Sequence, residues 1–506
     1  MRTTTVRSTP AYSNRIGARV CHRAIASLVG VAACFFAPLR AQKIVEALHL
    51  DRKHPALQWF EYCRADGGLL TIGHASRHSS RFLVLTKYDG DFKKQWQSQI
   101  MEQNGMREVC QLSCIGNRVL VFFVEEFKDR EFKTFYTEFD LTGKKIAEYK
   151  QILAVKQSDR KSATMRFVRS INNRRLLAFR PDKTPSGDKT LQWTLFSHDG
   201  KEPRAGVLRM PYKDDELQVR EVRTGNSGQI YILAKQYRTS RPRDSDDVRF
   251  LLFRYAPDQE NAKEAELTFE GRYVTDLTLK PDKDENLVLA GFYSNRSAAE
   301  IIGVLYAKFD PVEGRITVRN MQEFDRAFLE QYLSPRQIER GRELSDFYLD
   351  DVVLRSDGGV MILAEQYYVS STSFRDISGF WYSRDLHHYD DVIIFSIGAD
   401  GKIEWRTIVS KTQSGELPDQ LSYIHVVGPE ALYLFYKARL KGFGLNVYCT
   451  IVDYNGKIVS TKPFFENFGA ADVFYRESSE QISNDEALLV WYHSRKKTFS
   501  ILKVEF

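Results

Sequence analysis

The sequence lacks the short motifs that mark the common catalytic and nucleotide-binding sites. It contains no Gly-x-Ser-x-Gly nucleophile elbow, no phosphate-binding loop and no His-Glu-x-x-His helix. These absences exclude the best-recognised hydrolase, NTPase and zinc-protease signatures, although a site assembled from distant residues would leave no such motif. The clues to function therefore lie in the architecture and in the places where unusual side chains gather.

Cysteine is scarce, with six residues in 506, of which four follow residue 41. Cys110 and Cys114 fall in one predicted strand, where four residues of extended chain separate them by about 13 Å, so they cannot bond to each other. A bond from Cys63 to one of them is possible in an oxidising compartment, but we expect buried free thiols here and at Cys449. No histidine lies near them at ligand spacing, and we expect no metal site.

Long apolar runs are absent after residue 41, where nothing approaches the roughly 18 apolar residues that a membrane-spanning helix needs. Residues 1–41 contain six arginines, no acidic residue and an apolar run from Ala24 to Ala37. This composition is typical of a secretory signal peptide, which we expect to be cleaved after Ala41. Lipidation at Cys34 is the alternative, because Val31-Ala32-Ala33-Cys34 resembles a bacterial lipoprotein box. We expect an exported protein, in the periplasm, at the cell surface or secreted from a Gram-negative-type envelope.

Net charge is nearly absent from the mature chain. Of the 73 basic residues, six lie within residues 1–41, which leaves 67 against 66 acidic residues. Nucleic-acid binding depends on a broad excess of positive charge. We therefore expect no nucleic acid among the partners.

The sequence does contain a repeat with a period of about fifty residues. Its clearest copy, 346–410, consists of four short strands with turns at Ser356–Gly359 and Ala399–Lys402 and an interruption between the second and third strands. Turns and apolar strands of this kind recur eight times along the chain. Short strands and turns at this period predict four-stranded sheets arranged radially. We predict an all-β fold, a β-propeller of eight four-stranded blades over residues 42–506, with seven blades or two packed sandwiches as alternatives.

The two ends of the mature chain complete one blade in this prediction. The eighth repeat ends at Phe506 without an outermost strand, and Lys43–Leu48 supplies a spare strand before the first repeat. Pairing the two removes the exposed edge that an open array would leave. We therefore expect the ring to be closed by strands from both termini.

At the second turns, Asp400-Gly401-Lys402 is followed by Trp405, and Asp89-Gly90 is followed by Trp96. This pattern resembles the repeat of the quinoprotein-like eight-bladed propellers, in which an Asp-x-x-Gly-Lys turn leads to a tryptophan that docks between blades. The sequence has no adjacent cysteine pair and only six tryptophans, so we expect no quinone and no other cofactor. The resemblance implies an exported binding scaffold, a group that includes a lipoprotein assisting outer-membrane barrel assembly.

Insertions gather on one face of the predicted disc, and the turns on the other face are short. The two longest insertions adjoin the sixth repeat. Residues 325–345 should be helical, with Ser334 as a cap and Pro335 in the first turn of a helix. Residues 369–388 should form an aromatic loop. Recognition residues commonly lie on loops held by a rigid scaffold, so this face is the predicted working face.

The aromatic loop supplies the predicted ligand-binding or partner-binding residues. They are Phe374, Phe380, Trp381, Tyr382, His387 and His388, with Tyr368 at the border. Aromatic rings give a large contact area at modest entropic cost. The alternative is that the rings only pack the loop onto the helical insertion. The two histidines do not predict a metal site, because adjacent residues of a strand point in opposite directions.

The leading functional hypothesis is a non-enzymatic exported propeller that binds a protein, peptide or glycan through its long-loop face. A polysaccharide hydrolase or lyase is the alternative, and it would require acids and histidines from several blades to converge in the central funnel. The neighbouring acids Asp350 and Asp351 do not predict a carboxylate pair, since adjacent positions of a strand face opposite sides.

Overall fold

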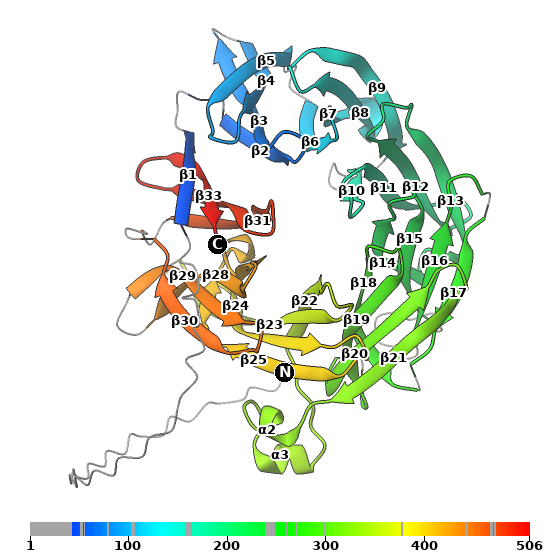
Figure 1. The fold of residues 1–506 in the computed structure, drawn as a ribbon, viewed down its shortest axis with the longest axis vertical. Helices are drawn as coiled ribbons and strands as arrows, with labels where there is room; N and C mark the ends of the chain where they lie inside the picture. The colour runs from blue at the N-terminus through cyan, green and yellow to red at the C-terminus, as the bar shows by residue number, and fades with distance from the viewer. Residues whose placement is uncertain are drawn as a thin grey trace, which may run out of the picture. The chain divides into compact units, whose positions relative to one another are not determined.

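Eight antiparallel sheets follow one another around a ring (Figure 1). In every sheet except the one that contains both ends of the described chain, the first strand in sequence order lies innermost. The computed structural model describes residues 43–506 except 51–53, 55, 78–79, 103–106, 157–163, 238–247, 260, 270, 298, 376–377, 441–443, 466–468 and 470–471. Residues 41–506 form one compact unit. The signal peptide and lipidation site expected within residues 1–41 lie outside the described residues.

The first four blades take their strands in sequence order from inside to outside. Blade 1 contains β2 (Ala56–Cys63), β3 (Gly68–Arg77), β4 (Ser80–Tyr88) and β5 (Lys94–Glu102). Blade 2 contains β6 (Arg107–Ile115), β7 (Arg118–Glu126), β8 (Glu131–Asp140) and β9 (Lys145–Lys156). Blade 3 contains β10 (Arg166–Arg169), β11 (Arg175–Lys183), β12 (Asp188–Ser197) and β13 (Arg204–Lys213). Blade 4 contains β14 (Leu217–Thr224), β15 (Ile230–Tyr237), β16 (Val248–Tyr255) and β17 (Lys263–Leu267).

The next three blades follow the same order. Blade 5 contains β18 (Tyr273–Pro281), β19 (Leu287–Ser294), β20 (Gly303–Asp310) and β21 (Arg315–Glu323). Blade 6 contains β22 (Phe347–Leu354), β23 (Val360–Arg375), β24 (Trp381–Ile397) and β25 (Ile403–Val409), and the short β26 (Gln413–Gly415) pairs with β24. Blade 7 contains β27 (Tyr423–Val427), β28 (Ala431–Leu440), β29 (Gly444–Asp453) and β30 (Ile458–Pro463).

Blade 8 joins the two ends of the described chain. It contains β31 (Val473–Gln481), β32 (Glu486–His493) and β33 (Thr498–Glu505), with β1 (Lys43–Leu50) as the outermost strand. β1 runs antiparallel to β33, and Leu48 lies opposite Ile501. The prediction of an eight-bladed β-propeller closed by strands from both termini is therefore confirmed.

Hydrophobic side chains fill the spaces between neighbouring blades. In β7, Val121 and Phe123 pack toward blade 1, whereas Leu120 and Phe122 pack toward blade 3. Both faces of the strand are buried, which explains why its sequence is continuously apolar rather than alternating. Burying each such side chain contributes roughly 1.5–3 kcal/mol, so the contacts between blades hold the ring together.

Two tryptophans dock on the next blade, as the repeat resemblance implied. Trp96 of blade 1 donates its indole N–H to the carbonyl of Leu141 in blade 2 at 2.8 Å, and its ring lies against Gly143. Trp405 of blade 6 donates in the same way to Tyr454 of blade 7 at 2.9 Å. A side chain at Gly143 would place its Cβ 2.8 Å from the indole, so glycine permits this close approach.

The inner strands contain bulges, which the alternating sequence pattern does not reveal. The register between the first and second strands of a blade slips by one residue in five blades. The residues left over are Gln58, Cys110, Arg220, Thr275 and Asp350. In β31, residues 476–479 stand opposite a single residue of β32, so this bulge is longer. A bulge redirects the side chains beside it, so adjacent residues no longer have to face opposite sides.

Cys63 and Cys114 form a disulfide between the inner strands of blades 1 and 2, with their Cα atoms 5.3 Å apart. Cys110 and Cys449 are free. The expectation of free thiols is therefore wrong for Cys63 and Cys114. The distance between neighbouring inner strands, which sequence spacing does not give, brings these two residues within bonding range.

The insertion between blades 5 and 6 contains two short helices, α2 (Arg326–Leu329) and α3 (Pro335–Glu339). Ser334 precedes α3 and donates from its backbone N–H to the side-chain oxygen of Gln337 at 2.9 Å. Two single-turn 3-10 helices also occur, at Lys128–Arg130 and Pro418–Gln420. Among the described residues, no helix is long and apolar enough to cross a membrane.

Candidate functional site

The segment expected to be an aromatic loop is mostly strand. β23 and β24 stay paired well beyond the blade, from Tyr367 opposite Tyr389 to Arg375 opposite Trp381. β22 pairs with β23 only as far as Gln366, and β26 pairs with β24 only at 387–389. The described residues between 370 and 386 therefore project beyond the flanking strands. We call residues 367–389 the hairpin extension.

The hairpin extension displays aromatic rings on both of its faces. Residues that lie directly opposite each other on paired strands share a face. Tyr368 and His388 stack on one face with ring centroids 4.5 Å apart, and Phe374 and Tyr382 stack farther along the same face at 5.8 Å. The pairing with Arg375 places Trp381 on the other face. The rings that were predicted as one cluster are thus divided between two surfaces.

The two histidines point in opposite directions, as their adjacent positions require. His387 hydrogen-bonds through Nδ1 to the Tyr367 hydroxyl at 2.9 Å, on the Trp381 face. His388 hydrogen-bonds through Nε2 to the Ser370 hydroxyl at 2.8 Å, on the Phe374 face. Within the described part of the chain, no three His, Cys, Asp or Glu side chains gather as metal ligands.

The rings near the hairpin tip are strongly exposed. Trp381 is 72% exposed, Phe380 67%, and Phe374 and Tyr382 48% each. The helical insertion contacts β24 next to the base of the hairpin extension, where the Tyr332 hydroxyl donates to Asp391 at 3.2 Å. Packing against the helices therefore does not account for the aromatic residues at the tip.

A buried polar cluster anchors the base of the hairpin extension. The Lys411 side chain is fully buried, and its Nζ lies 2.6 Å from Glu365 Oε1. It also donates to the carbonyl of Tyr389 at 2.9 Å and to the side chain of Gln413 at 2.7 Å. The Ser422 hydroxyl, at the start of blade 7, donates to the other oxygen of Glu365. Burial lowers the pKa of Lys411 and raises the pKa of Glu365, and the contact between them opposes both shifts.

A second polar cluster lies on the inner strands, and the bulge at Asp350 creates it. Asp351 accepts from Lys280 of blade 5 at 2.5 Å and lies 3.2 Å from His425 of blade 7. Asp350 instead pairs with Arg476 of blade 8. Burial alone would raise the pKa of Asp351, but His425 and Lys280 lower it below its usual range. The bulge at Asp350 therefore accompanies ion pairs that join these two adjacent acids to different blades.

This inner cluster brings together a lysine, two acids, a histidine and an arginine from four blades, as the alternative of a funnel site requires. The Arg476 guanidinium also lies 5.7 Å from the ring of Tyr423. Both carboxylates are, however, held in ion pairs. The arrangement therefore ties blades together, and neither acid is left as a free general acid or base. The sequence shows that Asp350 and Asp351 are adjacent acids, but it does not show the bulge in the strand at Asp350.

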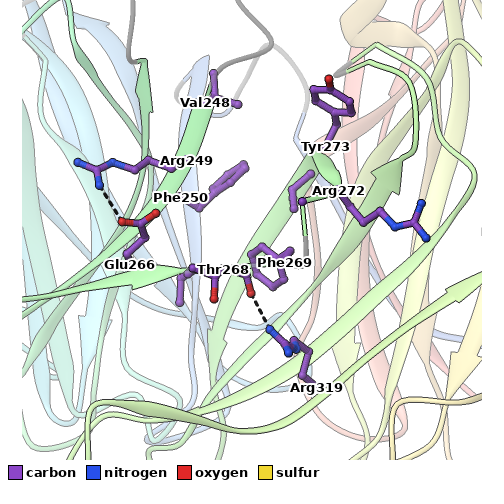
Figure 2. Close-up of a pocket in the computed structure, with 12 residues that line it drawn as sticks. Val248, Arg249, Phe250, Glu266, Thr268, Phe269, Arg272, Tyr273 and Arg319 are labelled. Carbon is purple, nitrogen blue, oxygen red and sulfur yellow. Dashed lines mark hydrogen bonds and ion pairs between the residues drawn. The ribbon is translucent and has the colours of Figure 1, made fainter.

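A pocket of about 500 Å³ lies between blades 4 and 5 (Figure 2). Three arginines line it, but each already donates to the protein. Arg249 pairs with Glu266 at 2.7 Å, and Arg319 donates to the carbonyl of Thr268 at 2.9 Å. Arg272 hydrogen-bonds to the side chain of Asn295. The Arg319 contact links blade 5 to the segment that follows β17 of blade 4, whereas the other two contacts lie within blade 4 and within blade 5.

Comparison with known proteins bears on the fold. No family model and no curated protein matches the chain. The WD40 domain of SCAP from fission yeast is 8% identical with a TM-score of 0.41, over 92% of this chain and 98% of that chain. The β-propeller domain of the Trilobed protease from Pyrococcus furiosus is 9% identical with a TM-score of 0.36, over 78% of this chain and 95% of that chain. Prolyl oligopeptidase B from Galerina marginata is 10% identical with a TM-score of 0.39, over 89% and 56% of the two chains. At such identities, the likeness concerns the fold alone, which is a β-propeller.

Proposed function

We propose that this chain is an exported, non-enzymatic β-propeller that binds a partner protein through the hairpin extension of blade 6. The observation that carries the proposal is the exposure of four aromatic side chains on one projecting hairpin: Phe374, Phe380, Trp381 and Tyr382. Aromatic side chains dominate the energetics of protein interfaces when a partner buries them. Isolated exposed rings are common, but a group of this size on one element marks an interaction surface.

The hairpin extension is preorganised for binding. Phe374 and Tyr382 already stack on each other, so little side-chain entropy remains to be lost when a partner covers them. The buried contact between Lys411 and Glu365 fixes the base. A projecting element with rings on both faces suits insertion into a groove of a protein, whereas small molecules are bound in concave pockets. A protein is therefore favoured over a free sugar as the occupant of this surface.

Two further observations support the wider assignment. The Cys63–Cys114 disulfide is typical of proteins that fold in an oxidising compartment, in agreement with the signal peptide expected from the sequence. The docking of Trp96 and Trp405 on the following blades agrees with the repeat of the quinoprotein-like propellers.

Polysaccharide hydrolysis or elimination is the second candidate function. The convergence of Asp350, Asp351, His425 and Arg476 on the inner strands favours it. The pairing of both carboxylates weighs against it, because a general acid must be able to give up a proton to the substrate. Binding through the hairpin extension therefore remains the first proposal.

Photo-crosslinking tests the proposal directly. The photoreactive residue p-benzoylphenylalanine replaces Tyr382 in one chain, and Val312, an exposed residue at the turn between β20 and β21, in a matched control. Crosslinking in an envelope extract should yield one protein adduct at position 382 and none at position 312. The double variant Trp381→Ala, Tyr382→Ala should weaken binding of that purified protein at least about thirtyfold. Equal crosslinking from both positions, or unchanged affinity of the double variant, would overturn the proposal.

A further inference from the structure

A pocket of about 640 Å³ lies where the ring closes, between blade 8 and blade 1. Its volume falls within the range of roughly 300–1,000 Å³ that is usual for small-molecule sites. Trp59 and Gln58 of β2 line one side, and Tyr475, Ser478 and Glu480 of β31 line the other. The hairpin extension of blade 6 contributes no residue to it. The pocket is thus a separate candidate site.

Irregular inner strands shape this pocket. Gln58 is the bulged residue of β2, and residues 476–479 form the long bulge of β31. The other bulged inner strands in the described part of the chain each carry one extra residue. Bulges are common beside binding sites, where they redirect side chains. The pocket therefore lies at the largest departure from regular pairing among these strands.

Two aromatic rings in the pocket are held in place by their own contacts. Trp59 donates its indole N–H to the carbonyl of Val109 in blade 2 at 3.1 Å, yet the residue remains 37% exposed. Tyr475 stacks on Phe499 with ring centroids 5.9 Å apart. Fixed rings offer flat apolar surfaces with little entropy to lose on binding.

The polar groups of the pocket are suited to a ligand without net charge. Amide side chains are supplied by Gln58 and Gln111, and a hydroxyl by the exposed Ser478. Among the described residues that line the pocket, Glu480 is the single charged one, and Arg64 lies 3.0 Å from it. Arg64 also donates to the carbonyl of Ile482 at 2.6 Å. An anionic ligand would therefore meet a carboxylate and, among these described lining residues, no basic side chain.

We propose that this pocket binds a ring of a neutral saccharide. A sugar ring combines apolar C–H faces, which match the indole of Trp59, with hydroxyl groups that can donate to Glu480 and exchange hydrogen bonds with amides. The pocket residues provide both kinds of surface around one space. This inference concerns binding only, and it does not depend on the proposed protein-binding role of the hairpin extension.

Isothermal titration of the purified chain with defined oligosaccharides tests the inference. The probes are maltohexaose, cellohexaose and the N-acetylglucosamine hexamer, with a galacturonic acid hexamer as the charged comparison. At least one neutral probe should bind, and the charged probe should bind at least about tenfold more weakly. Trp59→Ala should weaken binding of the neutral probe about tenfold, and Trp59→Phe should retain most of it because a ring remains.

Two further variants keep the test decisive. Ser478→Trp introduces a large side chain at an exposed position and should abolish binding by filling the pocket, without the loss of the Trp59 hydrogen bond that Trp59→Ala entails. Val312→Ala, at the exposed turn between β20 and β21, should leave saccharide binding unchanged. The inference is overturned if no neutral probe binds at 5 mM, about the weak end of measurable affinity. It is equally overturned if Ser478→Trp binds as the wild type does or if the charged probe binds best.

Discussion

Asp350 of blade 6 and Arg476 of blade 8 form an ion pair, although blade 7 lies between these two blades in the ring. The two residues are separated by 126 positions in the sequence, and each lies in a bulge of its inner strand. Arg476 also donates to the hydroxyl of Ser422, which precedes the inner strand of blade 7, at 2.8 Å. The bulges therefore do more than disturb pairing, since they allow one side chain to link three consecutive blades next to the point of ring closure.

Breaking this pair should destabilise the ring. Arg476→Met leaves the largely buried Asp350 without its partner, and we expect a loss of about 1–3 kcal/mol in the free energy of unfolding. This value is below that of a fully buried pair because the Arg476 side chain is 36% exposed. Urea unfolding followed by circular dichroism measures the change.

The double variant Asp350→Asn, Arg476→Met serves as the control for that experiment. It removes both charges and should recover much of the lost stability, because no unpaired carboxylate remains. If the single and double variants unfold at the same urea concentration, the ion pair does not contribute in the manner proposed.

The disulfide between Cys63 and Cys114 should be measurable by thiol titration. When a chain without residues 1–41 is unfolded in guanidinium, two thiols should react with the titrant, those of Cys110 and Cys449. After reduction, four thiols should react. Replacing Cys63 and Cys114 together by serine should lower the free energy of unfolding by about 2–5 kcal/mol. A reductant should then destabilise the wild type but not this variant. Four thiols before reduction would contradict the bond.

The number of blades could be predicted from the sequence, whereas the bulges within individual strands could not. Eight recurring turns and apolar strands such as 118–123 were sufficient to predict eight blades, because burial on both faces gives a strong and repeated pattern. The closing strand could be predicted because Lys43–Leu48 had no other strand to pair with in the sequence. A bulge adds a single residue to one strand, as at Asp350, and so produces no repeated pattern in the sequence.

The hairpin extension is a second feature whose structure could not be fully predicted from the sequence. Residues 369–388 were predicted to be an aromatic loop that interrupts the sixth repeat. β23 and β24 nevertheless pair with each other inside blade 6, and their pairing continues outward through Ser370 opposite Leu386. The pairing set within the blade therefore continues into a segment that has no hydrophobic core of its own. Sequence reasoning found the aromatic residues but did not divide them between two faces.

The Lys411–Glu365 contact should control the order of the hairpin base. Lys411→Met leaves Glu365 buried without a cation, and we expect a loss of about 3–5 kcal/mol. Hydrogen exchange should also quicken at the backbone amides of 387–389, since Lys411 holds the carbonyl of Tyr389. The double variant Glu365→Gln, Lys411→Met should exchange more slowly than the single variant. Unchanged exchange at 387–389 in Lys411→Met would show that the cluster does not order the hairpin.

The exposed rings of the hairpin extension should matter for binding and not for folding. Phe374→Ala, Trp381→Ala and Tyr382→Ala should each change the free energy of unfolding by less than about 1 kcal/mol, because about half or more of each residue is exposed. Phe328→Ala in the helical insertion provides the contrast, since Phe328 is only 2% exposed and its loss should cost about 3–5 kcal/mol. Thermal and urea unfolding of the four variants measures both effects. If the hairpin variants lose as much stability as Phe328→Ala, the rings serve to hold the hairpin in place, and the exposed surface proposed for the partner protein does not exist.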